Sequence, residues 1–282
     1  MNKATVIAEF QRRFTACPGN TLTEANAIAP ELVGLRLFDA PLIGVAKADD
    51  PLFEVFRAPE VIGPWHKSPL DWLPGAKSVL SLFLPFTEPV RVSNRGARTD
   101  PSPQWLHGRV EGQAFINAFT ERLRDWLTEQ GFEACVPALD PGFQAYSAKN
   151  PLTGQPDDSA FGSNWSERHA AYVCGLGTFG LSKGLITRKG MAGRFCSVIT
   201  NLELEPDLRS YTGVYDNCTL CGACVRRCPV QAISLETGKD HRICKVKQDE
   251  SSRTFAPRYG CGLCQTGVPC EHQIPIRPAK NP

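Results

Sequence analysis

The stretch from Asp216 to Pro229 reads D-N-C-T-L-C-G-A-C-V-R-R-C-P and places cysteines at Cys218, Cys221, Cys224 and Cys228. The spacing is C-x2-C-x2-C-x3-C-P. Three thiolates at three-residue steps can hold one iron-sulfur cubane, whereas the fourth thiolate, next to a proline at the start of a helical turn, points away towards a second cubane. One such stretch therefore predicts a second set of ligands elsewhere in the chain.

The second set follows within the last quarter of the sequence, at Cys244, Cys261, Cys264 and Cys270. Eight thiolates are what two 4Fe-4S clusters require, and the spacing is that of bacterial ferredoxins. By the ligand order of those proteins, Cys218, Cys221, Cys224 and Cys270 hold one cluster, and Cys228, Cys244, Cys261 and Cys264 hold the other. This crossed pairing would tie the two halves of a small ferredoxin-like domain together.

Two other uses of the eight cysteines stay open. Two four-cysteine zinc sites would also consume them, although zinc-binding C-x2-C pairs are usually separated by a long spacer. A disulfide framework belongs to small secreted domains, and this chain is long and shows no secretion signal. The four remaining cysteines have no ligand spacing and are expected to be buried free thiols; they are Cys17, Cys135, Cys174 and Cys196.

Length and composition predict two domains. The chain has 282 residues, of which 42% are hydrophobic, so it can bury one large core and a small satellite, with boundaries expected at 1–210 and 211–282. The N-terminus has no apolar signal core, and the most apolar stretch, Val79 to Phe86, is far shorter than the ~20 residues of a membrane span. A soluble cytoplasmic protein without a membrane partner is expected.

The net charge argues against a broad nucleic-acid surface. The formal charge is +2, and two clusters with their eight thiolates would change it to about −2. A local basic stretch lies at 239–258, where basic side chains beside anionic clusters are a simpler explanation than contact with RNA.

The first 210 residues show alternating helix and strand patterns. Apolar residues at helical spacing predict helices over Lys3–Phe14 and Val110–Gln130, the second ended by Gly131. Runs rich in β-formers predict strands, and the run that ends at Phe86 is apolar enough to be central in a sheet. This order is typical of an α/β layer architecture. The predicted strands are Leu42–Ala46, Ala76–Phe86, Phe132–Leu139 and Phe195–Leu202.

A long segment without regular pattern, Asp140 to Trp165, is followed by a helix over Glu167–Cys174 and a glycine-rich turn. Connections of this length are usually functional. The turn contains G-L-G-T-F-G, but it follows a helix and precedes a strand, which is not the context of a dinucleotide-binding loop. Close backbone approach to a large planar ligand and a tight helix-to-strand crossing both remain explanations of the glycines.

Residues 170–190, A-A-Y-V-C-G-L-G-T-F-G-L-S-K-G-L-I-T-R-K-G, and residues 194–204, R-F-C-S-V-I-T-N-L-E-L, precede the cysteine groups. This combination resembles the epoxyqueuosine reductase and reductive dehalogenase superfamily from about Pro41 onwards. The resemblance implies a nitroreductase-like α/β domain that binds base-off cobalamin, followed by a ferredoxin-like domain with two 4Fe-4S clusters that delivers electrons to the cobalt.

The resemblance also implies site residues. The corrinoid pocket would be lined by Gly175, Gly177, Gly180, Lys183 and Gly184 of the turn, and by Arg194, Ser197 and Thr200 of the last strand. Asp140 stands where the epoxyqueuosine reductases place a catalytic aspartate before an E-R pair, although the 26 residues between it and Glu167 exceed the gap of that family. The further candidate proton donors are Tyr146, Asp157, Asp158 and Tyr172, each of which could also be a solvated loop acid or a packed ring.

Three departures mark this chain as a short branch with an unassigned substrate. The C-terminal helical repeats of epoxyqueuosine reductases do not follow the second cysteine group, which weakens the prediction of a tRNA substrate. The export signal expected of respiratory dehalogenases is not seen. The spacing from Cys264 to Cys270 is longer than the superfamily's usual spacing. The expected partners are a small-molecule or modified-nucleoside substrate and a low-potential electron donor such as ferredoxin or flavodoxin.

The leading hypothesis is therefore a cytoplasmic, corrinoid-dependent reductase with two clusters. Reduction of a substrate usually needs two electrons, whereas cubanes pass one at a time, so a cofactor that bridges both regimes is needed near a cluster. A flavin could replace the cobalamin. A ferredoxin-like electron carrier, whose first domain only binds a partner protein, is the alternative from another functional class.

Overall fold

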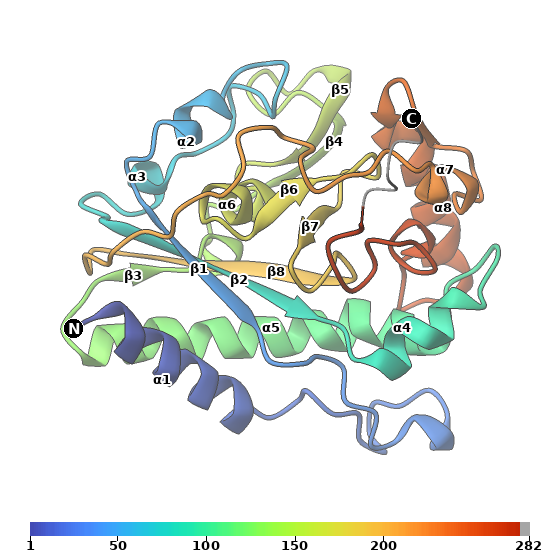
Figure 1. Ribbon diagram of the computed structural model, residues 1–282, viewed down its shortest axis with the longest axis horizontal. Helices are drawn as coiled ribbons and strands as arrows, with labels where there is room; N and C mark the ends of the chain where they lie inside the picture. The colour runs from blue at the N-terminus through green and yellow to red at the C-terminus, as the bar shows by residue number, and fades with distance from the viewer. Residues whose placement is uncertain (277–282) are drawn as a thin grey trace.

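The computed structural model describes residues 1–276, built around a four-stranded antiparallel sheet of order β1-β2-β8-β3 (Figure 1). All eight residues of β2 are buried, and β2 lies inside the sheet, as its apolar composition predicts. In the register of the sheet, Ser81 of β2 lies opposite Gly44 of β1 and Ser197 of β8. The strands are β1 (Leu42–Lys47), β2 (Ser78–Pro85), β8 (Gly193–Thr200) and the two-residue β3 (Ala134–Cys135).

Two helices cover one face of the sheet, α1 (Lys3–Ala16) and the 27-residue α5 (Pro103–Glu129). Each begins at a side-chain cap: Asn2 accepts from the Thr5 amide and Ser102 accepts from the Trp105 amide, which satisfies backbone donors at the helix start. Aromatic side chains from both helices pack on alternate residues of β2 and β8 and form the larger core of the protein. The two helices on this face are those predicted from apolar residues at helical spacing in the sequence.

The opposite face is covered by α6 (Glu167–Val173) with the short helices α2 (Leu52–Val55) and α3 (Pro69–Trp72). Beyond α6 lies the hairpin of β6 (Gly177–Phe179) and β7 (Leu185–Thr187). Helices therefore lie on both sides of the sheet, which explains why β2 is buried along its whole length rather than on one face. The mixed α/β class is confirmed, with an antiparallel sheet at its centre.

The cysteine-rich segment lies beside β7 and α4 (Glu88–Arg95) at one end of the sheet (Figure 1). Its buried Glu271 pairs with Arg91 and Arg95 of α4, at 3.1 and 2.8 Å. These contacts fix the segment on the first part of the chain. Its elements are α7 (Ala223–Arg226), β9 (Ile233–Ser234), β10 (Gly238–Lys239), α8 (His241–Thr254) and the 3-10 turn η3 (Leu263–Gln265).

Two predictions of local structure were wrong. The expected strand Phe132–Leu139 is reduced to β3, followed by the 3-10 turn η2 (Pro137–Leu139), because Pro137 has no amide hydrogen to continue a ladder. The segment from Asp140 to Trp165 is not irregular: it forms a hairpin of β4 (Ala145–Lys149) and β5 (Pro156–Ser163). A further 3-10 turn, η1 (Pro30–Leu32), lies before β1.

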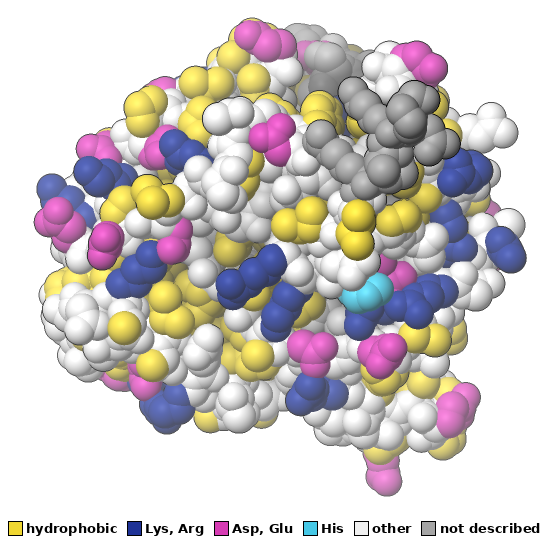
Figure 2. Space-filling model, viewed as in Figure 1, with side chains coloured by type: hydrophobic (Ala, Val, Ile, Leu, Met, Phe, Trp, Pro, Cys, Tyr) yellow, Lys and Arg dark blue, Asp and Glu magenta, His cyan; other side chains and the backbone are white. Residues whose placement is uncertain are grey.

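Acidic and basic side chains alternate on the face shown in Figure 2, with hydrophobic side chains between them, and no broad patch of one charge covers that face. Within residues 1–276, none of the helices combines the length and apolar character needed to span a lipid bilayer.

Candidate functional site

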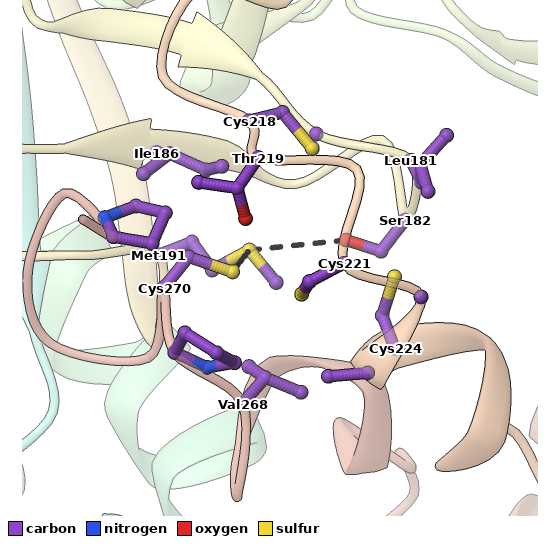
Figure 3. A pocket seen from close by; sticks show the side chains of 15 residues that line it. Leu181, Ser182, Ile186, Met191, Cys218, Thr219, Cys221, Cys224, Val268 and Cys270 are labelled. Atoms are coloured by element: carbon purple, nitrogen blue, oxygen red, sulfur yellow. Dashed lines mark hydrogen bonds between the residues drawn. The ribbon is translucent and has the colours of Figure 1, made fainter. Parts of the chain in front are cut away.

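Four thiols gather around one cavity between the β6–β7 hairpin and the cysteine-rich segment. Cys218, Cys221, Cys224 and Cys270 line it together with Met191 and Ser182, and Figure 3 shows their sulfur atoms around a common space. Burial, and then its thiol neighbours Cys224, Cys218 and Cys221, raise the pKa of Cys270 to about 12. We call these four the first thiol group; they are the residues that the sequence assigns to one cluster.

The second thiol group lies next to the first and consists of Cys228, Cys244, Cys261 and Cys264. The pKa of Cys261 is raised to about 12, chiefly by burial; the Leu263 amide lowers it, whereas Cys264, Cys244 and Cys228 raise it. The two groups adjoin, because Cys264 also contributes to the raised pKa of Cys224. Backbone and side-chain donors reach this group: the Ala232 amide donates to Cys228 Sγ at 3.2 Å, and the Gln248 side chain donates to Cys244 Sγ at 3.8 Å.

No three His, Cys, Asp or Glu side chains within residues 1–276 are arranged as ligands of a single metal ion. Each cysteine of a cubane binds a different iron atom, so a cluster spreads its thiolates around itself rather than on one point. All twelve cysteines are unpaired, and Cys17, Cys174 and Cys196 are buried as expected, whereas Cys135 is half-buried.

The glycine-rich turn lies against the first thiol group. A Cβ on Gly180 would stand 3.8 Å from Cys218 Sγ, and a Cβ on Gly177 would stand 2.1 Å from the Ile186 carbonyl oxygen. Gly177 therefore allows the two strands of the β6–β7 hairpin to approach closely. Gly175 lies near the Leu208 carbonyl, and Gly184 lies near the Met191 and Ser182 side chains.

The outer edge of β8 is open where the sequence places part of the corrinoid pocket. β3 pairs only with Ile199 and Thr200, so the residues from Gly193 to Val198 have no strand partner on that side in the described structure. Open edges leave backbone donors and acceptors available to another group. Arg194 lies on this edge and donates to the Gln113 side chain of α5, whereas Ser197 and Thr200 are buried in the sheet.

Arg168, at the start of α6, lies beside the second thiol group. Its side chain is exposed, yet desolvation by the surrounding protein lowers its pKa, while the Cys264 and Cys244 thiols act in the opposite direction. Its positive neighbours are Arg109 of α5 and Arg194 of β8, and burial, followed by Arg109 and Arg168, lowers the pKa of Arg194 well below its ordinary value.

Glu167, the neighbour of Arg168 in sequence, turns the other way and lies against the sheet. Neither carboxylate oxygen has a hydrogen-bond partner, and burial raises the pKa of this group to about 7. The nearby Ser197 hydroxyl and Trp165 indole offset only part of that effect, since the indole already donates to Ser197 at 3.0 Å. Close to neutral pH this carboxyl is therefore an acid that can hold a proton inside the protein.

The candidate proton donors lie apart from one another. Asp140 is half-buried and accepts a hydrogen bond from the Gly142 amide at 2.7 Å, with Cys135 Sγ 3.9 Å from its other oxygen. Tyr146 donates to Gln144 at 3.0 Å on β4, and Tyr172 packs against Phe179 and Tyr211. Asp157 accepts from Asn150 at 3.1 Å in the hairpin, and the side chain of Asp158 lies outside the described residues. Among the described residues, no contact joins Asp140 to the thiol groups or to Arg168.

Sequence reasoning missed Arg109 and Arg168 as members of the site. Arg168 carries a signal in the sequence, because it belongs to the E-R pair Glu167-Arg168. Arg109 carried no signal, since an arginine in a long amphipathic helix is usually a solvated residue. Tyr259, which receives a hydrogen bond from Arg109 at 3.1 Å and lies under its guanidinium, could not be connected to it by sequence spacing.

The cysteine run matches a known family model. Residues 211–234 match the 4Fe-4S binding domain, and this range contains the first four cysteines of the two groups. Among curated proteins, the tetrachloroethene reductive dehalogenases of Desulfitobacterium hafniense and Dehalobacter restrictus are each 35% identical over 115 residues, which is 38% of this chain and 20% of theirs. The chain thus spans about a fifth of the length of these relatives.

Solved structures extend the likeness to almost the whole chain. The epoxyqueuosine reductase of Streptococcus thermophilus aligns with a TM-score of 0.54 at 16% identity, over 96% of this chain and 66% of that one. A crystal structure of epoxyqueuosine reductase with an epoxyqueuosine-modified tRNA stem loop gives 0.55 at 18%, with the same coverage. A catabolic reductive dehalogenase gives 0.51 at 15%, over 83% and 30%. The fold is that of the epoxyqueuosine reductases and reductive dehalogenases, and the resemblance that the sequence motifs indicate is confirmed.

Proposed function

We propose that this protein is a reductase in which two 4Fe-4S clusters pass electrons to a corrinoid, and that a nitroreductase-like α/β layer holds the corrinoid at the open edge of β8. The observation that carries this proposal is the placement of the second thiol group beside Arg168. A cofactor beside Arg168 would lie next to a cluster, as electron transfer in single steps requires. The likeness of this chain to known reductases supports the same reading.

The donor sets fit the clusters. Each thiol group contains four cysteines, and thiolate is the ligand that holds iron in a cubane. The first group adjoins the second through Cys224 and Cys264, and its Cys221 is exposed. We propose that electrons from an external low-potential donor, such as a ferredoxin or flavodoxin, enter at the exposed side and leave through the second group.

The residues along the edge of β8 also fit a corrinoid. Cobalamin carries many amide side chains and needs backbone donors and acceptors, which the unpaired edge of β8 offers from Gly193 to Val198. Gln113 and Arg194 add polar groups on the neighbouring helix and strand. Lys183 of the glycine-rich turn lies near Lys239 and Asp240, since burial and then Lys239 lower its pKa while Asp240 raises it.

Bound cobalamin would supply reducing chemistry that can deliver two electrons to an organic substrate. The chain itself would orient the cofactor, exclude water and provide a proton. The β4–β5 hairpin reaches α8, where Phe161 stacks on His241 with ring centroids 4.8 Å apart, so it closes one side of the region. We propose Asp140 as the proton donor, because it follows directly on a rigid turn at the base of this hairpin.

Anaerobic reconstitution tests the function. Iron and sulfide should each reach about eight per chain, because two cubanes need eight of each. Cyanocobalamin added to the cluster-loaded protein should be retained on gel filtration and change its absorbance. Stoichiometric zinc with little iron would refute the clusters; full clusters without cobalamin retention would leave an electron carrier, and retention of a flavin instead would identify a flavoprotein.

The cluster assignment has its own test. Cys228→Ala should damage the cluster of the second thiol group and spare the first, whereas Cys224→Ala should do the reverse, because each removes one of four ligands from a different group. Electron paramagnetic resonance of the reduced variants distinguishes the two cluster signals. Loss of the same signal in both variants would contradict the crossed pairing.

A further inference from the structure

The C-terminal end of α4 contacts both thiol groups, through residues that stand next to two of the cysteines. Glu271 follows Cys270 of the first group, and Arg227 precedes Cys228 of the second group. In the proposed crossed pairing, these two cysteines are the ligands that each cluster takes from the other part of the segment. A ligand that is distant in sequence from its partners depends on contacts outside its own loop to hold it in place.

Glu271 is anchored by the side chains of α4. Its carboxylate is 2% exposed and accepts hydrogen bonds from Arg91 at 3.1 Å and from Arg95 at 2.8 and 2.9 Å. The same carboxylate accepts from the Gly267 amide at 2.7 Å, which closes the loop that ends at Cys270. Hydrogen bonds between charged groups are about twice as strong as neutral ones, so these contacts fix the backbone next to Cys270.

Arg227 is anchored at the same end of α4. Its guanidinium donates to the carbonyl oxygens of Asn94 and Arg95 at 3.1 and 3.0 Å, and to that of Leu263 at 3.1 Å. The last carbonyls of a helix lack partners within the helix, and a nearby arginine satisfies them and favours the negative end of the helix dipole. Leu263 belongs to the loop of the second thiol group, so one guanidinium connects α4, that loop and the backbone next to Cys228.

The two anchors meet at Arg95 and Gly267. Arg95 donates to Glu271 through its side chain and accepts from Arg227 through its carbonyl oxygen. Gly267 donates to Glu271, and a Cβ on Gly267 would stand 3.3 Å from the guanidinium carbon of Arg227. The carboxylate next to one thiol group and the guanidinium next to the other therefore share one short stretch of α4.

We infer that the C-terminal end of α4 positions one ligand of each cluster. It acts on Cys270 of the first cluster through Glu271. It acts on Cys228 of the second cluster through Arg227. Both anchors are positioning residues, because each acts through the neighbouring cysteine. The inference deepens the proposed function and rests on its two clusters, not on the corrinoid. The α/β layer would then decide whether each cluster is complete, although all eight thiolates belong to the cysteine-rich segment.

The test compares each anchor variant with the variant that lacks the ligand itself, in the whole chain after anaerobic reconstitution. Glu271→Ala should reproduce the spectrum of Cys270→Ala, because a cubane with three thiolates loses its fourth iron and becomes a 3Fe-4S cluster. Such a cluster gives an electron paramagnetic resonance signal when oxidised, whereas an intact oxidised cubane is silent. Iron should fall from about eight to about seven per chain, and the second cluster should keep its signal in the reduced protein.

Arg227→Met should affect the other cluster. It keeps most of the side-chain volume and removes the three hydrogen bonds, so it should reproduce the spectrum of Cys228→Ala and spare the first cluster. Glu271→Gln keeps one acceptor oxygen and should convert the first cluster in a smaller fraction of molecules than Glu271→Ala. It also keeps the inference testable if the alanine variant does not fold.

Two matched variants control for the loss of an ion pair and of a contact at a helix end. Glu9→Ala removes a carboxylate that bridges Arg12 and Arg13 on α1, at 2.6 and 2.7 Å. Arg209→Met removes a guanidinium that donates to the Val173 carbonyl oxygen at the end of α6, at 3.1 Å. Both variants should keep the iron content and the spectra of the parent protein.

Parent-like spectra in the Glu271 variants or in Arg227→Met would overturn the inference. Equal damage to both clusters in every anchor variant would overturn it too, because that result would show a merely structural role for these contacts. Missing clusters in the unchanged protein would overturn the inference together with the proposed function. Missing corrinoid retention alone would overturn only the proposed function, because the positioning of the thiolates does not involve the corrinoid.

Discussion

Two opposing effects act on the carboxyl group of Glu167, the helix dipole and burial. It sits in the first turn of α6, where an acid is favoured by the helix dipole, but the helix packs on the sheet and buries the carboxyl between Trp165 and Ser197. Without a hydrogen-bond partner the charged form is penalised, and the pKa rises from 4.5 to about 7.

This shift predicts a pH-dependent stability. Below pH 4.5 the carboxyl is protonated in the folded and unfolded states and contributes nothing. As the pH rises through 7 the unfolded state has already lost its proton, so folding is disfavoured by up to about 3 kcal/mol. Glu167→Gln removes the effect, and its melting temperature relative to the parent should rise by about 5 °C between pH 5 and pH 8. A difference that stays constant with pH, in anaerobic scans of cluster-loaded protein, would contradict the assignment.

The cysteines of the site could be predicted from the sequence, whereas the arginines could not. A ligand run such as Cys218 to Cys228 has fixed spacing because short loops must wrap one cubane, so the spacing itself carries the chemistry. The arginines have no such spacing. Arg109 and Arg194 are 85 positions apart and meet only because α5 packs on β8. Long-range proximity of this kind depends on the tertiary fold, which no local pattern encodes.

At the scale of elements, the β4–β5 hairpin explains why its region was predicted to be irregular. Its first strand, β4, is mostly exposed and lacks the alternation of apolar residues that marks a half-buried strand. Polar contacts hold it instead: Asn164 accepts from the Gln144 amide at 2.9 Å and donates to the Gly142 carbonyl at 2.8 Å. The long helix α5, in contrast, was predictable because burial of one face places apolar residues at helical spacing. The strand β2 was predictable because burial on both faces selects a run of mostly apolar residues.

The base of this hairpin carries the proposed proton donor. Asp140→Asn keeps the oxygen that accepts from the Gly142 amide, so the turn, the clusters and cobalamin binding should be unchanged. Turnover of the substrate should fall by about 10²-fold or more, since general acid catalysis contributes that much. The measurement is the rate at which the substrate reoxidises dithionite-reduced, corrinoid-loaded protein. Asp125→Asn, at an exposed position on α5, is the control. Unchanged turnover in the Asp140 variant would exclude it as the donor.

At the scale of the whole molecule, the cysteine-rich segment is fitted onto the α/β layers at a few close contacts. Met191 and Ala192, just before β8, donate backbone hydrogen bonds to Glu271, at 3.1 and 3.0 Å, next to Cys270. Arg227 donates to the carbonyls of Asn94 and Arg95 on α4 and to that of Leu263 in η3. The electron flow proposed from the thiol groups towards β8 would depend on this fit, because it fixes the distance between them.

Gly262 offers a test of that fit. It lies between Cys261 and Cys264 with φ +67°, and a Cβ there would stand 2.0 Å from the Trp105 ring of α5. Gly262→Ala should therefore push the second thiol group away from α5, lower its iron content and reduce the melting temperature. Gly131→Ala is a matched control, because Gly131 has a similar φ of +85° but nothing within 4 Å of its Cβ position.

Both variants strain the backbone by a similar amount, so the difference between them isolates the steric contact with Trp105. Iron per chain and the intensity of the two cluster signals should be near normal in Gly131→Ala and reduced for the second cluster in Gly262→Ala. Trp105→Phe should partly rescue the Gly262 variant, because the smaller ring vacates the space near the new methyl group. Equal losses in the two glycine variants, or no rescue, would mean that α5 does not position the second cluster.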